Sequence, residues 1–266
     1  MPRARHKESR PSFGRAKIIS HPRYIESAWL EQYEGLARRF ACLLRSNTGD
    51  LVEIGCGRGQ LTIPLSRLVA SDRITVVDRF TGPYSKDYRH LKSTLTREKV
   101  RKVSVVVSDY VSWLTRQLHD RYDALISNEF LCEIDSAEMR SFLSECYRVL
   151  KPKGITIHGF LSPQARNFRQ RLTIEADSNP RWTKFPPKEW FSPEPESVAY
   201  QLGRTGFRRV RTLKIRSNLR IKASAAEELL KRWSVKETFW KLHEEQLKQE
   251  GLEIPDWILV TGLKPP

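Results

Sequence analysis

Three glycines alternate with other residues directly after a short apolar run. The stretch LVEIGCGRGQL places Gly55, Gly57 and Gly59 between a predicted strand and a predicted helix. Glycine tolerates positive φ angles and lets a ligand approach the backbone closely. The spacing departs from the G-x-G-x-x-G dinucleotide fingerprint, because Gln60 or Thr62 stands at the third position, and the chain has no G-x-x-x-x-G-K-[ST] phosphate loop. A nucleotide-like ligand without a pyrophosphate therefore suits this turn better than NAD.

Two aspartates end the next two predicted strands. Asp78 ends RITVVD and Asp109 ends KVSVVVSD. A carboxylate at Asp78 can accept hydrogen bonds from both ribose hydroxyls, as in dinucleotide-binding folds. Asp109 can accept from an adenine amino group, with Phe80 or Tyr110 against the ring. A single strand-end aspartate is a common turn former, but three successive strands that end in G-x-G-x-G, Asp and Asp indicate an adenosine site.

Alternating strand and helix patterns position these residues. Apolar, β-branched runs alternate with helical segments over roughly residues 50–157, and the strand-like segments RRVRTLKIRSNLRIK and DWILVTGLK come later in the chain. Repeated β–α units of this length predict a mostly parallel sheet covered on both faces. We expect a doubly wound, Rossmann-like α/β fold that binds ligands at the carboxyl ends of its strands.

The other segments are predicted to form an arm and two insertions. Residues 1–23 are basic, contain Glu8 as their only acid and lack an apolar period, which predicts a flexible arm. Residues 24–266 are predicted to form one domain. Insertions at about 162–195 and 223–252 interrupt its strand–helix alternation, and we interpret them as lids.

The motifs, taken in this order, resemble those of the class I S-adenosylmethionine-dependent methyltransferases. VEIGCGRG is similar to their first motif, VVDR and VVSDY to the next two, and YDALISNEFLCEI to the fourth. ECYRVLKPKGITI is similar to the helix, turn and strand of the ubiquinone/menaquinone-biosynthesis type, with Lys153 where a glycine is usual. The resemblance implies an enzyme that uses S-adenosyl-L-methionine, built on a seven-stranded sheet whose last strand is antiparallel.

The matched motifs also imply which residues bind the cofactor. They are the residues of the glycine turn, the strand-end acids and their neighbours: Glu53, Gly55, Cys56, Gly57, Gly59, Asp78, Arg79, Asp109, Tyr110 and Asn128. Asn128 invites comparison with the N-P-P-Y motif of amino-group methyltransferases, but Glu129 and Phe130 break that pattern. We expect the backbone of Asn128 to hold the methionine end of the cofactor.

Few residues need to be catalytic, because methyl transfer depends mainly on alignment and needs a base only for a protonated acceptor. Glu129 is a candidate base or amine-binding group, with a solvent-facing position as the alternative. His158 is the second candidate base, and a histidine packed under a loop is its alternative. Cys132 lacks the P-C or T-C motif of 5-methylcytosine enzymes and is expected to be a buried thiol. The four cysteines form no C-x-x-C pair, so no metal is expected.

The charge of the chain bears on the methyl acceptor. Lys and Arg total 47 against 31 Asp and Glu, a formal net charge of +16 over 266 residues. This balance suits RNA or an acidic membrane surface, and equally a solvated basic surface. The 162–195 insertion mixes Arg166 and Arg169 with Trp182 and Trp190, as either an RNA-binding surface or a lid over a small substrate would.

We favour a small, partly apolar acceptor. The alternatives are tRNA or rRNA held by the arm and the lid, and a protein side chain; a non-catalytic cofactor-binding module is less favoured. The chain has no run of about 18 apolar residues and no apolar signal segment, so we expect a cytoplasmic protein without a membrane span. The oligomeric state stays open.

Overall fold

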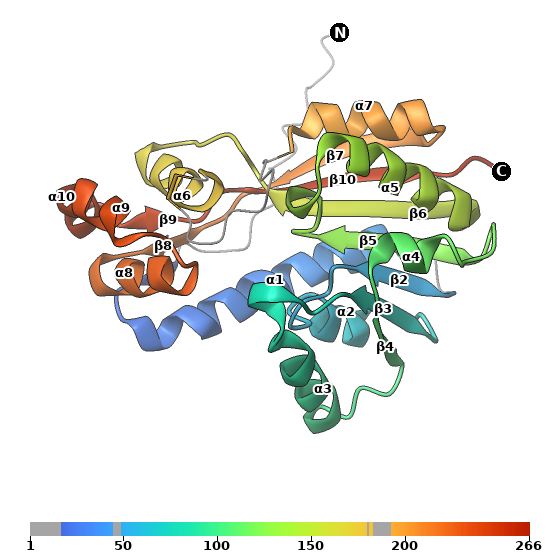
Figure 1. Ribbon diagram of the computed structural model, residues 1–266, viewed down its shortest axis with the longest axis horizontal. Helices are drawn as coiled ribbons and strands as arrows, with labels where there is room; N and C mark the ends of the chain where they lie inside the picture. Colours follow the sequence, from blue (N-terminus) through green and yellow to red (C-terminus); the bar gives the residue numbers. More distant parts are fainter. Residues whose placement is uncertain (1–16, 45–48, 180, 183–192) are drawn as a thin grey trace, which may run out of the picture.

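A seven-stranded sheet forms the centre of the molecule (Figure 1). This computed structural model describes residues 17–44, 49–179, 181–182 and 193–266. In spatial order the strands are β4 (Val103–Val107), β3 (Ile74–Asp78), β2 (Leu51–Ile54), β5 (Tyr122–Asn128), β6 (Leu150–Leu161), β10 (Trp257–Leu263) and β7 (Arg208–Ile215). The first five pair in parallel, and β10 runs antiparallel to both β6 and β7. The predicted sheet, including its antiparallel last strand, is confirmed.

Helices cover both faces of this sheet because its central strands are apolar on both sides, as in β2, where all four residues are buried. One face packs against α1 (Ile25–Leu43), α2 (Thr62–Leu68) and α3 (Asp87–Arg97). The other packs against α4 (Tyr110–Leu114), α5 (Ser136–Val149) and α7 (Pro195–Thr205). Short 3-10 helices are η1 (Pro22–Tyr24), η2 (Gly82–Tyr84) and η3 (Leu131–Glu133). The arrangement is the doubly wound fold expected from the sequence.

A second lobe lies beyond the carboxyl ends of the parallel strands, whose arrows point toward it in Figure 1. Its small sheet has the order β1 (Lys17–Ile19), β8 (Leu219–Ile221) and β9 (Leu252–Glu253). Its helices are α6 (Phe168–Ser178), α8 (Ala223–Arg232), α9 (Glu237–Leu242) and α10 (Glu244–Gln249). The lobe has a hydrophobic core of its own, in which the rings of Trp182 and Phe239 meet edge to face at 5.5 Å.

This lobe changes the predicted division of the chain. Residues 17–23 form β1 and η1, and β1 pairs in parallel with β8, so the predicted boundary of the arm at residue 23 is too late. The described parts of both insertions share one core with this N-terminal segment, instead of forming two separate lids. Residues 1–16 of the arm, and residues 183–192 with Trp190, lie outside the described residues.

The segment RRVRTLKIRSNLRIK divides into β7 and β8, which belong to different sheets. The chain therefore leaves the central sheet after Ile215 and enters the lobe before it returns as β10. Among the described helices, none is both long and apolar enough to cross a lipid bilayer.

Candidate active site

The turn after β2 is built from three glycines in the left-handed region of φ. The φ angles of Gly55, Gly57 and Gly59 are +75°, +48° and +80°, values that L-residues with side chains seldom adopt. A Cβ atom on Gly59 would overlap Leu91 Cδ1, whereas one on Gly57 would meet no atom closer than Asp87 Oδ2, at 3.9 Å. Gly59 is therefore needed for packing against α3, and Gly57 leaves open space above the turn.

Asp78, at the end of β3, ties this turn to the neighbouring strand. Its Oδ2 accepts a hydrogen bond from Gly57 N at 2.8 Å, and its Oδ1 accepts one from Phe80 N at 2.9 Å. Each carboxylate oxygen can accept a further hydrogen bond, and the side chain is only half-buried. The carboxylate thus lies beside the open side of the turn, where the sequence places a ribose.

Glu53 and Cys56 lie under the turn. Both side chains are buried, and Glu53 Oε2 accepts a hydrogen bond from Thr62 Oγ1 at 2.7 Å. Burial raises the pKa of Glu53 to about 8 and that of Cys56 well above its ordinary value. In this structure Glu53 links β2 to the start of α2, so it supports the shape of the turn.

The predicted adenine contacts are only partly arranged as expected. Asp109 Oδ1 caps α4 by accepting from Val111 N and Ser112 N, and its Oδ2 makes no hydrogen bond with the residues described. Tyr110 is buried with its ring packed edge-on against Phe130 and Phe142. The Tyr110 ring is part of the hydrophobic core under α5, and its contact with an adenine ring stays a prediction.

Phe80 and Arg79 lie at the rim of the same region. The Phe80 ring packs against Tyr88 at 5.2 Å and is mostly buried. Arg79 is exposed. Burial raises the pKa of the Glu133 carboxyl above its ordinary value, and the nearby positive charge of Arg79 partly opposes this rise. Phe80, 7% exposed, and Tyr110, 8% exposed, are buried to the same extent, so the structure does not choose between the two predicted aromatic contacts.

Asn128 ends β5 with an unused polar atom. Its Oδ1 is buried and has no hydrogen-bond partner among the described residues. The side chain lies over Gly159 of β6, where a Cβ atom would overlap Oδ1. Buried acceptors are nearly always satisfied, so this amide is suited to a donor supplied by a ligand.

Comparisons with known proteins agree with this geometry. A family described as "Methyltransferase domain" matches residues 51–154, which contain the glycine turn, Asp78, Asp109 and Asn128. Comparison with curated proteins gives no match.

Residues 51–154 form a methyltransferase domain of the class I, S-adenosylmethionine-dependent type.

Solved structures show the same fold at low sequence identity. A SAM-dependent methyltransferase from Archaeoglobus fulgidus has 17% identity and a TM-score of 0.54, over 90% of this chain and 100% of that one. A cyclopropane-fatty-acyl-phospholipid synthase-like protein from Lactobacillus casei has 12% identity and a TM-score of 0.62, over 92% and 95%. A putative sarcosine dimethylglycine methyltransferase from Galdieria sulphuraria has 14% identity and a TM-score of 0.57, over 88% and 86%. These matches do not single out the ubiquinone/menaquinone-biosynthesis type.

The residues of this methyltransferase fit S-adenosylmethionine. The open side of Gly57 would take the methionine part, the carboxylate of Asp78 would hold the ribose hydroxyls, and the unpaired Oδ1 of Asn128 could accept from an amino group. When bound, this cofactor supplies a methyl group on a positively charged sulfur. The alternation of glycines without a phosphate loop agrees with a cofactor that carries no phosphate.

A narrow pocket opens between the ends of β5 and β6 and helix α6 of the lobe. Its polar lining comes from Glu129, Cys132, Ser162, Thr173, Asp177 and Ser178, and its apolar lining from Phe160, Leu161, Ile174, Pro193 and Pro255. Glu129 Oε1 accepts from Leu161 N at 2.8 Å. Burial, assisted by the negative charge of Asp177, raises the pKa of Glu129 to about 8; burial, assisted by Glu133, raises that of Asp177 to about 6.

His158 lies on the other face of the sheet from α1 and has no access to this pocket. It is fully buried against Phe142, with Nδ1 2.8 Å from Ser127 Oγ and Nε2 2.8 Å from Thr156 Oγ1. Burial lowers its pKa to about 3. The structure does not support His158 as a base, because both ring nitrogens already have partners inside the core.

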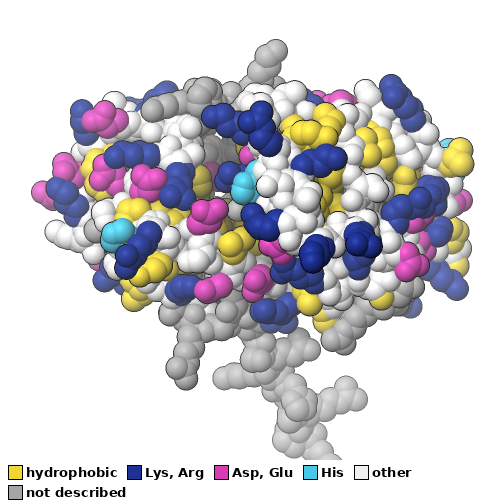
Figure 2. Space-filling model, turned by 90° about the horizontal axis from the view of Figure 1, so that it is seen from below, with side chains coloured by type: hydrophobic (Ala, Val, Ile, Leu, Met, Phe, Trp, Pro, Cys, Tyr) yellow, Lys and Arg dark blue, Asp and Glu magenta, His cyan; other side chains and the backbone are white. Residues whose placement is uncertain are grey.

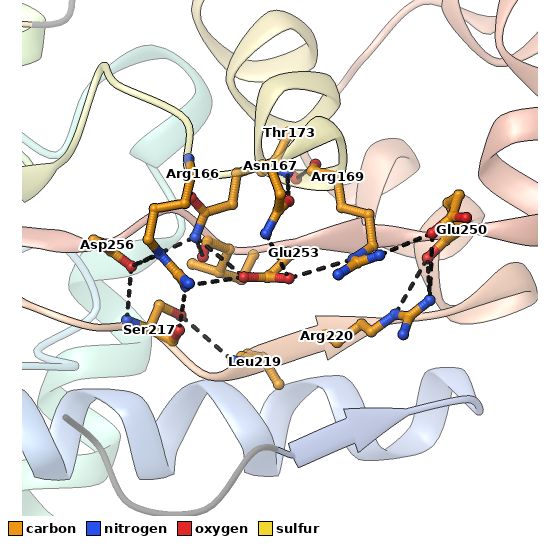
Figure 3. Close-up of polar contacts among 12 residues, drawn as sticks. Arg166, Asn167, Arg169, Thr173, Ser217, Leu219, Arg220, Glu250, Glu253 and Asp256 are labelled. Carbon is orange, nitrogen blue, oxygen red and sulfur yellow. Dashed lines mark hydrogen bonds and ion pairs between the residues drawn. The ribbon is translucent and has the colours of Figure 1, made fainter.

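Arg166 and Arg169, which the sequence suggested as ligands for RNA phosphates, instead form ion pairs that hold the lobe together. Figure 3 shows Arg166 between Asp256 and Glu253, with nitrogen–oxygen distances of 2.9 Å to each, and Arg169 between Glu253 and Glu250. Arg166 also donates to Ser217 O at 2.9 Å. The clamp, as we call Arg166 and its three partners, fixes α6 against the chain that enters β10.

Two parts of the site could not be recognised from the sequence. Asp177 is on α6, in an insertion with no motif, and only the packing of the lobe brings it to Glu129. Tyr33 of α1 lies close enough to Glu129 for that carboxylate to raise its pKa further, after burial. Trp182, predicted to belong to a lid or to an RNA-binding surface, is buried in the lobe core. Among the described residues, no group of His, Cys, Asp or Glu could hold a metal ion.

Proposed function

We propose that this methyltransferase acts on a small, partly apolar acceptor whose methyl-accepting atom is an amine nitrogen. The observation that carries this proposal is the pairing of Glu129 and Asp177 in the narrow pocket between the two lobes. Both carboxyl groups have a raised pKa, and no Lys or Arg of the described chain lines the pocket. An ammonium group would supply the missing positive charge.

The apolar lining supports the same acceptor class. Phe160, Leu161 and Ile174 would contact a carbon skeleton while the acids contact the nitrogen. Ligand sites commonly combine an apolar wall with a few convergent polar groups. The space enclosed by the pocket is about 20 Å³, room for about one water molecule, so the carbon skeleton of an acceptor would enter only if α6 moved away from the ends of β5 and β6.

Glu129 can become the base that such an acceptor needs. With a pKa of about 8, its carboxyl holds a proton at neutral pH in the free protein, and the positive charge of a bound ammonium would favour the ionised form that acts as a base. An ammonium ion that gives its proton to this ionised carboxylate gains the free lone pair with which nitrogen accepts a methyl group. Asp177, still charged at neutral pH, would keep the positive nitrogen of the product near the pocket.

A panel of matched acceptors tests this proposal. The enzyme would be incubated with S-adenosylmethionine and aryl-alkyl amines, alcohols and carboxylic acids of equal size, and methylated products measured by mass spectrometry. We expect methylation of amines alone. We expect Glu129→Gln and Asp177→Asn to lower kcat/KM for the amine at least tenfold, and Glu196→Gln on the exposed face of α7 to leave it unchanged. Equal methylation of the alcohols or acids would refute the amine assignment.

A further inference from the structure

The outer face of α3 carries a shallow, open groove with a purely basic and hydroxylic lining. The groove is lined by Arg89, Lys92, Ser93, Thr96 and Arg97. These positions are three, four, seven and eight residues from the first, so they fall on one side of the helix. Since no carboxylate lines the groove, it is suited to a ligand with negatively charged oxygens.

Most of the positive charge of this face is not neutralised by the described residues. Arg89 makes no hydrogen bond or ion pair with them, and of the three groove cations only Arg97 has an acidic partner, Glu98. Asp87 pairs with Arg58 at 3.3 Å, and Glu98 pairs with Arg67 and, at 3.6 Å, with Arg97. Arg166 of the clamp and the neighbouring Arg169, by contrast, each face carboxylates.

Figure 2 shows where this charge lies on the surface. In this view from below Figure 1, the side from which α3 projects, dark-blue Lys and Arg side chains gather near and to the right of the centre. Exposed Lys86, Lys99 and Arg101 flank the helix in the sequence and extend the basic surface at both ends.

Two tyrosines are exposed at the amino-terminal end of the groove. Tyr88 is 36% exposed and Tyr84 is 43% exposed, and the Lys92 ammonium lies 5.8 Å from the centre of the Tyr88 ring. Cations that bind phosphates beside aromatic rings that stack on bases are the usual means of binding single-stranded nucleic acid. A membrane surface is less suitable, because the apolar side of α3, with Leu91 and Leu95, is buried in the core.

We propose that the α3 face binds single-stranded RNA, with phosphates on Arg89, Lys92 and Arg97 and a base stacked on Tyr88. This binding site is separate from the pocket at Glu129 and does not depend on the identity of the methyl acceptor. RNA binding at this face would also give a role to part of the net positive charge of +16. The bound RNA would stay on the surface and would not enter the narrow pocket.

Fluorescence anisotropy of a short labelled oligouridylate tests the site. We expect the full-length enzyme to bind it with an affinity that falls steeply between about 50 and 200 mM salt. Arg89→Gln with Lys92→Gln should reduce the salt slope by about 1.4, since each phosphate contact on a single strand contributes about 0.7. Tyr88→Leu should weaken binding by about fivefold or more, without changing the slope, because stacking is worth at least about 1 kcal/mol per base.

The matched control lies at the opposite edge of the central sheet. Arg208→Gln with Arg211→Gln removes the same charge from exposed positions of β7, while α3 lies near β4 at the other edge. Equal weakening by this control would show non-specific attraction and overturn the proposal. It would also be overturned by no RNA binding at the lowest salt, or by binding of phosphatidylserine vesicles in place of RNA. All variants should keep their affinity for S-adenosylhomocysteine, so the result is independent of the amine assignment.

Discussion

Asp78 Oδ2 accepts a hydrogen bond from Gly57 N at 2.8 Å, which joins the end of β3 to the open position of the glycine turn. The same carboxylate also accepts from Phe80 N. One side chain therefore shapes both loops that border the proposed ribose position and still has acceptor capacity for the ribose itself. The two motifs, distant in the sequence, form one structural unit.

Asp78→Ala should weaken cofactor binding strongly. The change removes the ribose acceptor and leaves the Gly57 amide without its partner, so affinity for S-adenosylhomocysteine should fall by about 2 kcal/mol or more, as measured by isothermal titration calorimetry. Asp72→Ala, at an exposed position before β3, is the control and should leave the affinity unchanged. A folded Asp78→Ala protein that binds as tightly as the natural one would show that the ribose lies elsewhere.

Gly57→Ala and Gly59→Ala should separate binding from stability. Both positions have positive φ, so each alanine costs roughly 1 kcal/mol in backbone strain. Only the methyl group at position 59 would also collide with Leu91. Thermal unfolding without ligand should show the larger loss of stability for Gly59→Ala. With S-adenosylhomocysteine added, Gly57→Ala should lose more of the ligand-induced rise in melting temperature, relative to its own loss of stability. The reverse order would contradict the assignment of the open side of the turn to the ligand.

The central sheet could be predicted because the sequence pattern of each of its parallel strands is visible within a short segment of the chain. Each strand from residue 51 to 161 is a short apolar run next to an amphipathic helix, and the motif residues stand where strands end. The predicted turn at Lys153 is instead part of β6, and Lys153 takes a φ of +66° there, a conformation that glycine adopts more readily. The lobe could not be predicted, because β1 pairs with β8 across some 200 residues and only tertiary packing brings them together.

The residues of the site also divide into those that could be predicted from local sequence and those that depend on tertiary packing. Gly57 and Asp78 were recognisable from their spacing, whereas the presence of Asp177 of α6 in the same pocket as Glu129 depends on how the lobe packs against the central sheet. His158 has the residue type of a base, but period-two alternation along β6 places it on the face covered by α5. Arg166 and Arg169 looked like phosphate ligands because the acids that pair with them come more than 80 residues later.

The stability of the protein should fall as the pH rises from about 4.5 to 8. The pKa of Glu129 is about 8 in the folded protein against an ordinary 4.5, so the folded state holds the proton in this window and the unfolded state releases it. One such proton changes the free energy of unfolding by at most about 1.4 kcal/mol per pH unit. Glu53 contributes with the same sign.

Glu129→Gln should therefore make this pH dependence shallower. Urea unfolding at pH 5 and pH 8.5 checks it: relative to the natural protein, the variant should gain stability at the higher pH. Glu196→Gln, on the exposed face of α7, should leave the dependence unchanged. A natural protein more stable at pH 8.5 than at pH 5, with the difference abolished by Glu129→Gln, would mean that Glu129 is charged and paired in the folded state.

Arg166→Gln should destabilise the protein by about 3 kcal/mol or more, because it leaves the buried Asp256 and Glu253 without their main partner. Arg171→Gln, on α6, which begins two residues after Arg166, is the matched control. Arg171 is exposed, and the one side-chain contact it has among the described residues is with the ring of Phe168, so its replacement should change stability by less than about 0.5 kcal/mol. Urea unfolding at neutral pH measures both. Similar small losses for the two variants would show that the clamp does not hold the lobe in place.

Transfer of a labelled methyl group from S-adenosylmethionine into a cell extract tests the central claim most directly. The extract would be incubated with the natural enzyme or with Glu129→Gln, then separated into small molecules, RNA and protein before the label is counted. We predict label in the small-molecule fraction, retained on a cation-exchange column as a methylated amine, and at least tenfold less of it with Glu129→Gln. Label found in RNA or in protein, or in small molecules without basic nitrogen, would contradict the account.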